Sequence, residues 1–354
     1  MRVTNCFLLF LEVYIRSSLK YILFEERHIR QTALHFSVFF IFEGNLRKLP
    51  VYRKMEQVKG EVILSVYIIA FLIGLPTNLL ALYAFSVKIH SRPLPTDILL
   101  LNLTVSDLLF LIILPLKMHE AVSGMKWPLP SFLCSITSFT FYSTIYTSSL
   151  LLMAVSVVRY IAVAFPITYH QLQKPVYAII ISVVIWLISA AHCSITFVIQ
   201  HEPSLSSLDS SVCYESFSEK QLMILLPVRL EMFFVLCLIP LLICVYCYLR
   251  CILILYSRPR ISPMQKQKAI GMASGTVAVF LICVLPYNLS HLFSFFQGKS
   301  PSWRHYTLLL STLNSCIDPI IYYFSSSTFQ CIGKKLIFKK HVFTVSGKEP
   351  TISS

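Results

Sequence analysis

Seven long apolar stretches constrain this chain more than any other feature of its sequence. A helix needs about 20 mostly apolar residues to cross the hydrocarbon core of a bilayer. The stretches are long enough for that, hold few polar positions and are joined by short loops. The sequence therefore predicts an all-α membrane protein whose fold is a single seven-transmembrane helix bundle. The predicted spans are 62–86, 98–116, 132–158, 176–199, 222–249, 269–296 and 306–324.

The composition agrees with a polytopic membrane protein and excludes several other classes. Hydrophobic residues make up 56% of the 354 residues and charged residues only 13%, whereas a typical soluble domain is about 25% charged. The mean hydropathy is +0.71. An ordinary soluble domain, a disordered chain and a disulfide-dense secreted scaffold are all excluded.

The distribution of Lys and Arg predicts the orientation of the bundle, because cytoplasmic loops of membrane proteins are enriched in these residues. The first, third and fifth loops together with the segment after 324 hold 14 of them, and the other loops hold 5. We therefore place the N-terminus outside the cell and the C-terminus in the cytoplasm. The net charge of +14 then reflects cytoplasmic anchoring on anionic lipid and gives no indication of a nucleic-acid partner.

The first 61 residues do not fit this picture, since their 10 Lys and Arg would all have to be exported. Their apolar runs are too short to span a bilayer, and they lack the cleavage site of a signal peptide. We interpret residues 1–54 as an extension of doubtful function, with Met55 as the working start. The seven-span membrane domain is then 55–324, followed by a tail at 325–354.

Two of the 11 cysteines reach the outer, oxidising side of the predicted bundle. Cys134 lies at the start of the third span and Cys213 lies in the second outer loop. A disulfide between them would hold that loop over the mouth of the bundle. No spacing typical of a zinc site is present, so no metal centre is predicted.

Ionisable residues at membrane depth are costly and are candidates for function. Asp107 lies in the second span and Asp318 in the seventh, and Ser148 and Asn314 are placed to join them in one polar pocket. The functional interpretation is a site for Na⁺, acting as an allosteric ion, or for a proton. The alternative is a hydrogen-bonded network with a purely structural role.

A second group of polar residues is cationic and lies near the outer ends of four predicted helices. Arg229, Arg304, His192 and His291 reach one level, and their charges would repel unless an anion joined them. The guanidinium fork of arginine matches a carboxylate. We therefore predict a site for a small anionic ligand that enters from outside. Two aromatic residues are predicted to close this pocket, Tyr287 and Tyr142.

Two acidic residues provide an alternative to a ligand site. Glu231 could pair with Arg304 or with a histidine in the absence of ligand, and Glu215 could reach the mouth from the second outer loop. Either pairing would make the cationic cluster a structural ion-pair network.

Landmarks in the spans make this chain resemble the rhodopsin-like G-protein-coupled receptors. The landmarks, in order along the chain, are Asn78, Asp107 in Leu103–Asp107, Arg159-Tyr160, Trp186, Pro240, Cys283-Val-Leu-Pro286 and Asp318-Pro319-Ile-Ile-Tyr322. By this resemblance, Arg159, Tyr160, Pro286, Asp318, Pro319 and Tyr322 belong to the machinery that switches the receptor and couples it to a G protein.

Within that class the chain looks like the short-chain free fatty acid receptors, types 2 and 3. The resemblance is carried by the segments around Trp127, His192, Arg229, His291 and Arg304. It implies that Arg229 and Arg304 hold the fatty-acid carboxylate and that His291 assists them. The residues associated with the same pocket or its opening are His192, Tyr287, Tyr142 and Glu215.

One residue departs from the family pattern in a way that bears on signalling. The family usually has Glu or Asp directly before the arginine of the third span, and here Val158 takes that place. The acid normally pairs with the arginine and restrains the resting state. Its absence predicts a looser inactive state and higher basal signalling.

The sequence after the seventh span predicts contacts with the membrane surface and with regulatory proteins. Apolar residues interleaved with lysines between 325 and 340 predict a short amphipathic eighth helix on the inner leaflet. The Ser and Thr residues between 344 and 354 are candidate phosphorylation sites for desensitisation, with arrestin as a further partner.

The predicted function is a receptor at the plasma membrane for short-chain carboxylates of the acetate, propionate and butyrate class. It would signal through Gi, with Gq as a further candidate. A receptor for another small acid, such as lactate or a ketone body, is the first alternative. A monocarboxylate transporter is the second, and the absence of matching broken helices in the two halves weighs against it. An enzyme is not predicted, because no nucleophile accompanies the paired cations.

Overall fold

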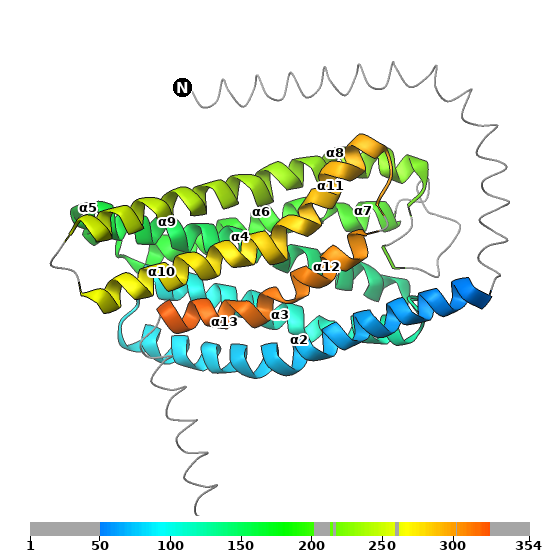
Figure 1. Ribbon diagram of the computed structural model, residues 1–354, viewed down its shortest axis with the longest axis horizontal. Coiled ribbons are helices and arrows are strands. Elements are labelled where there is room, and N and C mark those ends of the chain that lie inside the picture. Colours follow the sequence, from blue (N-terminus) through cyan, green and yellow to red (C-terminus); the bar gives the residue numbers. More distant parts are fainter. Residues whose placement is uncertain (1–49, 202–212, 215–216, 259–261, 302, 326–354) are drawn as a thin grey trace, which may run out of the picture. The chain divides into compact units, whose positions relative to one another are not determined.

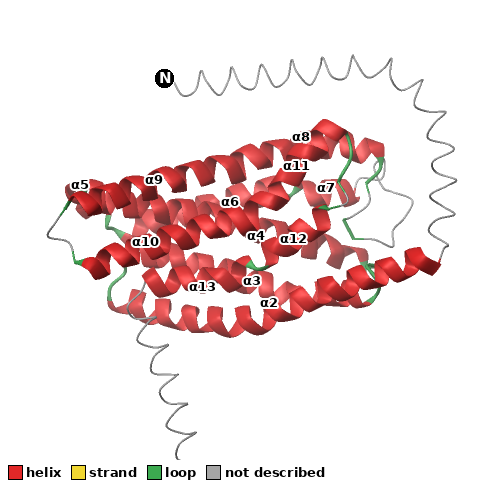
Figure 2. Ribbon diagram, in the orientation of Figure 1, coloured by secondary structure: helices red, strands yellow, loops and turns green. Residues whose placement is uncertain are grey.

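The computed structural model describes residues 50–201, 213–214, 217–258, 262–301 and 303–325, and within them it contains helices and no strand (Figures 1 and 2). The chain divides into two compact units, Met1–Lys59 and Gly60–Ser354. The second unit carries all of the predicted site residues. The predicted eighth helix falls outside the described residues.

The predicted spans coincide with long helices, several of them made of two or three consecutive segments. In chain order the helices are α2 (Pro50–Ser91), α3 (Pro95–Val122), α4 (Ser131–Ala164), α5 (Pro166–Leu172), α6 (Pro175–Cys193), α7 (Ile195–His201), α8 (Glu219–Met232), η1 (Phe233–Leu238), α9 (Ile239–Ser257), α10 (Pro263–Ala278), η2 (Val279–Val284), α11 (Leu285–Gln297), α12 (Arg304–Thr312) and α13 (Asn314–Ser325).

Six stretches of helix among the described residues are long and apolar enough to cross a membrane. They are Gly60–Ser91, Pro95–Val122, Ser131–Ala164, Pro175–Ile199, Glu219–Ser257 and Pro263–Gln297. The seventh predicted span is divided at Leu313 into α12 and α13, and each part alone is shorter than a bilayer crossing. Neither α12 nor α13 alone is long enough to be a seventh crossing, so the seventh span stays a prediction.

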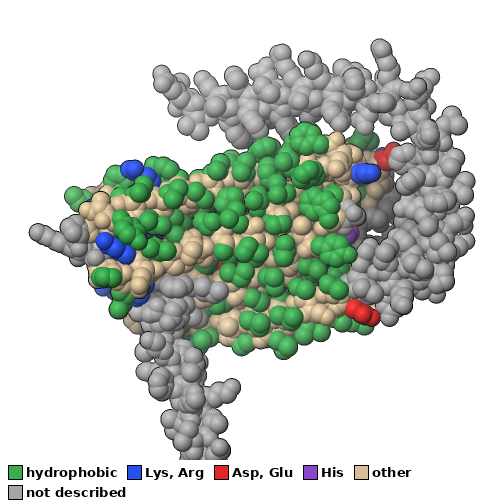
Figure 3. Space-filling view, viewed as in Figure 1, with side chains coloured by type: hydrophobic (Ala, Val, Ile, Leu, Met, Phe, Trp, Pro, Cys, Tyr) green, Lys and Arg blue, Asp and Glu red, His purple; other side chains and the backbone are tan. Residues whose placement is uncertain are grey.

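The charged side chains of the visible face lie toward the two ends of the bundle. Figure 3 shows hydrophobic side chains over the middle of the visible face and Lys and Arg near the end that carries α5 and the start of α10. That end corresponds to the loops for which we predict a cytoplasmic location. We call it the inner end, and we call the end with the Cys134–Cys213 disulfide the outer end.

Helix α4 occupies the centre of the bundle, where it packs against α3, α6 and α9. The main core cluster contains residues from all four of these helices, including Leu103, Leu151, Ile185 and Cys244. Because α4 is surrounded, its small and polar residues face neighbouring helices and not lipid. The third predicted span is therefore the scaffold on which the outer and inner sites are built.

Turns of π-helix interrupt the fifth and sixth predicted spans, each directly before a proline near the start of the next helix. The first, η1, precedes Pro240, and the second, η2, precedes Pro286. Proline has no backbone N–H and its ring clashes with the carbonyl four residues earlier, so the ordinary helical hydrogen-bond pattern cannot pass through it. The local widening of the helix accommodates that mismatch, and such bulges are common at functional sites.

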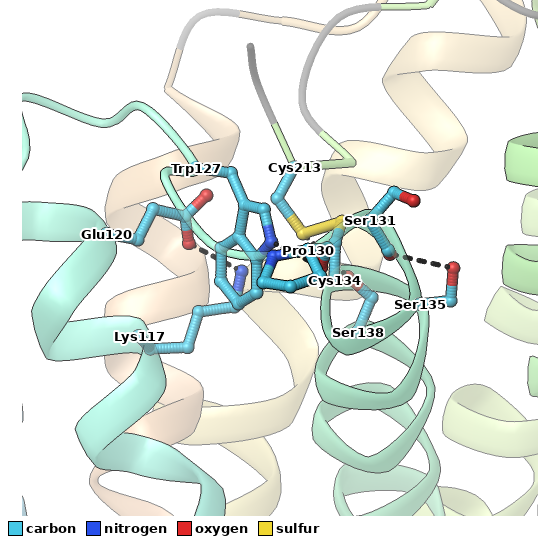
Figure 4. The surroundings of a disulfide bond; sticks show 9 residues. All are labelled: Lys117, Glu120, Trp127, Pro130, Ser131, Cys134, Ser135, Ser138 and Cys213. Carbon is cyan, nitrogen blue, oxygen red and sulfur yellow. Dashed lines mark hydrogen bonds and ion pairs between the residues drawn. A yellow bond between two sulfur atoms is a disulfide. The ribbon is translucent and has the colours of Figure 1, made fainter. Parts of the chain in front are cut away.

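A disulfide links Cys134 at the start of α4 to Cys213, with their Cα atoms 5.7 Å apart, which confirms the predicted bond (Figure 4). Beside it, the Trp127 indole donates a hydrogen bond to the carbonyl of Pro130 over 3.2 Å. Lys117 and Glu120 form an ion pair over 2.8 Å near the same indole. The disulfide anchors the segment at Cys213 to the outer end of α4, and Trp127 belongs to the same core cluster.

Candidate ligand-binding site

Two arginines lie buried near the outer end of the bundle. Arg229 is in α8 and is 2% exposed, and Arg304 is the first residue of α12 and is 4% exposed. The two guanidinium groups are close enough for their charges to repel one another. A buried cation is costly without a partner. Among the described residues, however, no carboxylate forms an ion pair with either arginine.

Each arginine donates one hydrogen bond to a neutral hydroxyl. Arg229 donates from Nη1 to Oγ of Ser300 over 2.9 Å, and Arg304 donates from Nη2 to the Tyr287 hydroxyl over 3.0 Å. Nη2 of Arg229 and Nε of Arg304 are buried and have no hydrogen-bond partner within the described structure. Because a buried polar group without a partner is unusual in a native protein, these two donors point to an acceptor that is not part of the described chain.

His291 lies in α11, is 2% exposed and belongs to the same group of residues. Its Nε2 is 3.2 Å from the hydroxyl of Tyr146, which also donates to Oδ1 of Asn288 over 3.1 Å. Its Nδ1 is buried and without a partner in the described part of the chain. The charges of both arginines act on this ring. An anion at the arginines would therefore also be near His291.

Aromatic rings line the region between the two arginines. Tyr287 stacks on Tyr142 with ring centroids 6.0 Å apart, and Tyr142 contacts Tyr214 at 5.4 Å. Tyr214 in turn contacts Phe217, whose ring centre lies 4.9 Å from the guanidinium carbon of Arg229. This chain of rings connects Arg304, through its bond to Tyr287, with Arg229. The site is thus a row of contacting aromatic rings with a cation at each end.

Three residues that contact this site were not expected from the sequence, namely Tyr146, Phe217 and Ser300. A signal exists for Tyr146, because it follows Tyr142 by one helical turn and therefore shares its face. Phe217 and Ser300 lie in connections between helices. No sequence spacing relates them to Arg229.

His192 is not brought into the arginine group. Its Nε2 is 3.3 Å from Oε1 of Glu231, and no contact described for His192 joins it to Arg229, Arg304 or His291. Glu231 is half-exposed. The predicted alternative of Glu231 pairing with a histidine is therefore what the structure shows, and that pairing leaves the two arginines unneutralised. Glu215 lies outside the described residues.

The polar residues of the second, third and seventh predicted spans also meet. Asp107, Ser148 and Asn314 line one small cavity of about 10 Å³, a volume that holds about one water-sized particle. The Tyr322 hydroxyl donates to Oδ2 of Asp107 over 2.9 Å. Asp318 is fully buried, and both of its carboxylate oxygens lack a hydrogen-bond partner in the described residues. Oxygen donors around a cavity of this size fit a small hard cation such as Na⁺.

The inner end holds the residues expected to couple to a partner protein. Tyr160 packs edge-on against Tyr246 of α9. Asp97 at the start of α3 forms an ion pair with Lys88 over 2.7 Å, and its charge interacts favourably with Arg159. A carboxylate of α3 thus acts on the arginine that lacks the usual preceding acid. Pro286 follows η2, and Pro319 lies within α13.

The family comparison agrees with this arrangement. The model of the family described as 7 transmembrane receptor (rhodopsin family) matches residues 77–322. Human free fatty acid receptor 3 is 48% identical over 277 residues, which are 78% of this chain and 80% of that receptor.

Two further receptors show a similar likeness. Mouse free fatty acid receptor 3 is 47% identical over 275 residues, covering 77% of this chain and 86% of the relative. Human free fatty acid receptor 2 is 45% identical over 273 residues, covering 76% and 83%. The chain therefore belongs to the rhodopsin family of seven-transmembrane, G-protein-coupled receptors and, within it, to the free fatty acid receptors.

Proposed function

We propose that this chain is a plasma-membrane receptor for short-chain carboxylates of the acetate, propionate and butyrate class, with its N-terminus outside the cell. The observation that carries the proposal is the pair of buried arginines that have donors to spare and no described carboxylate partner. The names of the relatives support a fatty acid as the ligand. Lactate and ketone bodies present the same carboxylate and stay alternative ligands.

The site offers a carboxylate three buried donors from three helices. These are Nη2 of Arg229 in α8, Nε of Arg304 in α12 and Nδ1 of His291 in α11. The last is a donor in the tautomer whose Nε2 accepts the Tyr146 hydroxyl proton in place of Asn288. A carboxylate accepts several hydrogen bonds, and those from arginine are strengthened by charge. The aromatic rings around the arginines exclude water and suit a short alkyl chain.

Activation is a shift between two populations of the bundle. A carboxylate that bridges Arg229 and Arg304 removes their repulsion and draws α8, α11 and α12 together at the outer end. The widened turn η2 before Pro286 offers a hinge about which α10 swings at the inner end. The opening beside Arg159 then accepts a G-protein α subunit, of the Gi type first and of the Gq type second.

A G-protein activation assay across straight-chain acids of two to twelve carbons tests the function and the site together. We expect responses to the shortest acids, and loss of at least two orders of magnitude in potency in Arg229→Ala and Arg304→Ala, because each leaves the other cation without a bridging ligand. Arg229→Lys keeps the charge without the guanidinium fork, and its potency should lie between those of the wild-type receptor and Arg229→Ala.

The matched control is Lys220→Ala, which removes an exposed cation near the outer end of α8 without touching the buried pair. It should respond like the wild-type receptor at equal surface expression. A full response from either arginine-to-alanine variant would refute the site. Uptake of labelled acetate in the same cells would instead indicate transport.

We also propose that the inner polar cavity takes Na⁺ as an allosteric ion, held by Asp107, Ser148 and Asn314 with Asp318 beside them. Two neighbouring buried carboxylates need a cation or a proton between them. In the same assay, replacing Na⁺ by N-methylglucamine should change agonist potency in the wild-type receptor and not in Asp107→Asn. Equal sodium sensitivity in both proteins would exclude the site.

A further inference from the structure

A short connection between α11 and α12 brings one hydroxyl into the candidate ligand-binding site. Helix α11 ends at Gln297, and Gly298 follows with φ of 65°, a left-handed conformation that favours glycine and turns the chain. Pro301 is buried, and its carbonyl accepts a hydrogen bond from the backbone N–H of Arg304 over 3.1 Å. The same turn therefore places Ser300 against one arginine and starts the helix that carries the other.

Ser300 gives Arg229 its one described hydrogen bond to a side chain. Its Oγ accepts from Nη1 over 2.9 Å, while Nη2 of the same guanidinium stays without a partner among the described residues. The ring of Phe217 lies 4.9 Å from the guanidinium carbon. Nη1 thus donates to a neutral acceptor, and Nη2 has N–H groups for which no acceptor is described. Each Nη carries two N–H groups, so a carboxylate that approaches the fork from the side of Ser300 takes the place of the hydroxyl at Nη1.

We propose that Ser300 is a latch that occupies part of the carboxylate site in the receptor without ligand and thereby sets its affinity. The inference rests on the proposed function. A charged acceptor forms the stronger hydrogen bond to a guanidinium, so the ligand displaces the hydroxyl and the latch opens. The short connection between α11 and α12 is then released from Arg229 when the ligand binds.

The effect on affinity depends on which state loses a contact. Removing the hydroxyl leaves a buried charged donor without its partner in the empty receptor, which is costly. The occupied receptor loses nothing, because the carboxylate already holds Nη1. Ser300→Ala should therefore bind acids more tightly, and we expect the EC50 of propionate to fall about tenfold.

Three variants and one physical measurement test the latch. Ser300→Ala should show the lower EC50 and a larger increase in thermal stability on adding propionate than the wild-type receptor shows. Ser300→Thr keeps the hydroxyl and should behave like the wild-type receptor. In Arg229→Ala the further change Ser300→Ala should have no effect, since the latch has nothing to hold.

The outcomes separate this inference from the proposed function. If Ser300→Ala leaves potency unchanged or weakens it while the wild-type receptor responds and Arg229→Ala does not, the latch is wrong and the function stands. A gain in Ser300→Ala that persists without Arg229 also overturns the latch. A wild-type receptor that responds to none of the acids overturns both.

Discussion

The surroundings of Arg159 depart from the pattern of its family. The usual acid before it is replaced by Val158, and the structure shows Asp97 of α3 as a carboxylate whose charge interacts favourably with this arginine. Asp97 is shared, because it also pairs with Lys88 over 2.7 Å. Asp97 is therefore a candidate for an electrostatic restraint on Arg159 that comes from another helix and is divided between two cations.

Restoring the acid should strengthen that restraint. We expect Val158→Glu to lower agonist-independent G-protein activation several-fold, because about 1 kcal/mol in favour of the resting state shifts the two populations by that factor. Asp97→Asn should raise it. The measurement is nucleotide exchange in membranes at matched receptor density.

Val157→Glu is the matched control for this change. It adds the same acid one position earlier, where the helix directs it to a different face, and it should leave basal activity unchanged. Equal basal activity in the wild-type receptor and in Val158→Glu would reject the restraint.

At the scale of elements, the sixth and seventh predicted spans are tied together at the proline hinge. The Ser311 hydroxyl of α12 donates to the carbonyl of Cys283 in η2 over 2.6 Å. Arg304 lies two turns earlier on the same helix as Ser311. A movement of Arg304 toward a ligand therefore reaches the hinge before Pro286 through one hydrogen bond.

Removing this hydrogen bond should separate binding from signalling. We expect Ser311→Ala to reduce the maximal G-protein response to propionate while changing the dissociation constant by no more than about fivefold, since the loss of one neutral hydrogen bond is worth about 1 kcal/mol at most sites. Saturation binding and G-protein activation, measured on the same membranes, give the two quantities.

Ser294→Ala provides the comparison, because its hydroxyl bonds only to the carbonyl of Ser290 in its own helix among the contacts described. It should retain the full maximal response. A Ser311→Ala receptor with unchanged maximal response would show that the hinge works without this link.

At the scale of the whole molecule, the bundle is held by contacts between segments far apart in the chain. Asn78 of α2 donates to the carbonyl of Ser315 in α13 over 2.8 Å, next to the interruption at Leu313. The Cys134–Cys213 disulfide holds the outer loop to α4. All of these residues lie after position 59, in the second compact unit.

A chain that begins at Met55 should therefore suffice for surface expression and for the response to ligand. We expect residues 55–354 to reach the cell surface and to respond to propionate with the potency of the full chain, because every residue of the candidate site lies within it. Dose–response curves at equal surface density compare the two chains. N-terminal sequencing of the protein expressed from the full gene tests the start directly, and a mature chain beginning near Met1 would contradict it.

Much of the fold and part of the candidate site could be predicted from the sequence. Apolar stretches of bilayer length determined where helices form. In lipid, a single stretch of about 20 residues can satisfy all its backbone hydrogen bonds internally only as a helix. Pro240 and Pro286 determined where the fifth and sixth spans are interrupted. Arg229 was recognisable as a candidate site residue because a charge inside an apolar span is costly, and Arg304 because it lies at the same level just before the seventh span.

Only the tertiary structure decided which hydrogen bonds the site residues make. The pairing of His192 with Glu231, the bond between Arg229 and Ser300 and the place of Tyr146 beside His291 join residues from different segments. A helical period relates neighbours within one helix and contains no information on which residues of two packed helices or of a connecting turn meet. The sequence by itself therefore determined that cations lie at the mouth of the bundle, and packing determined which of their donors remain for a ligand.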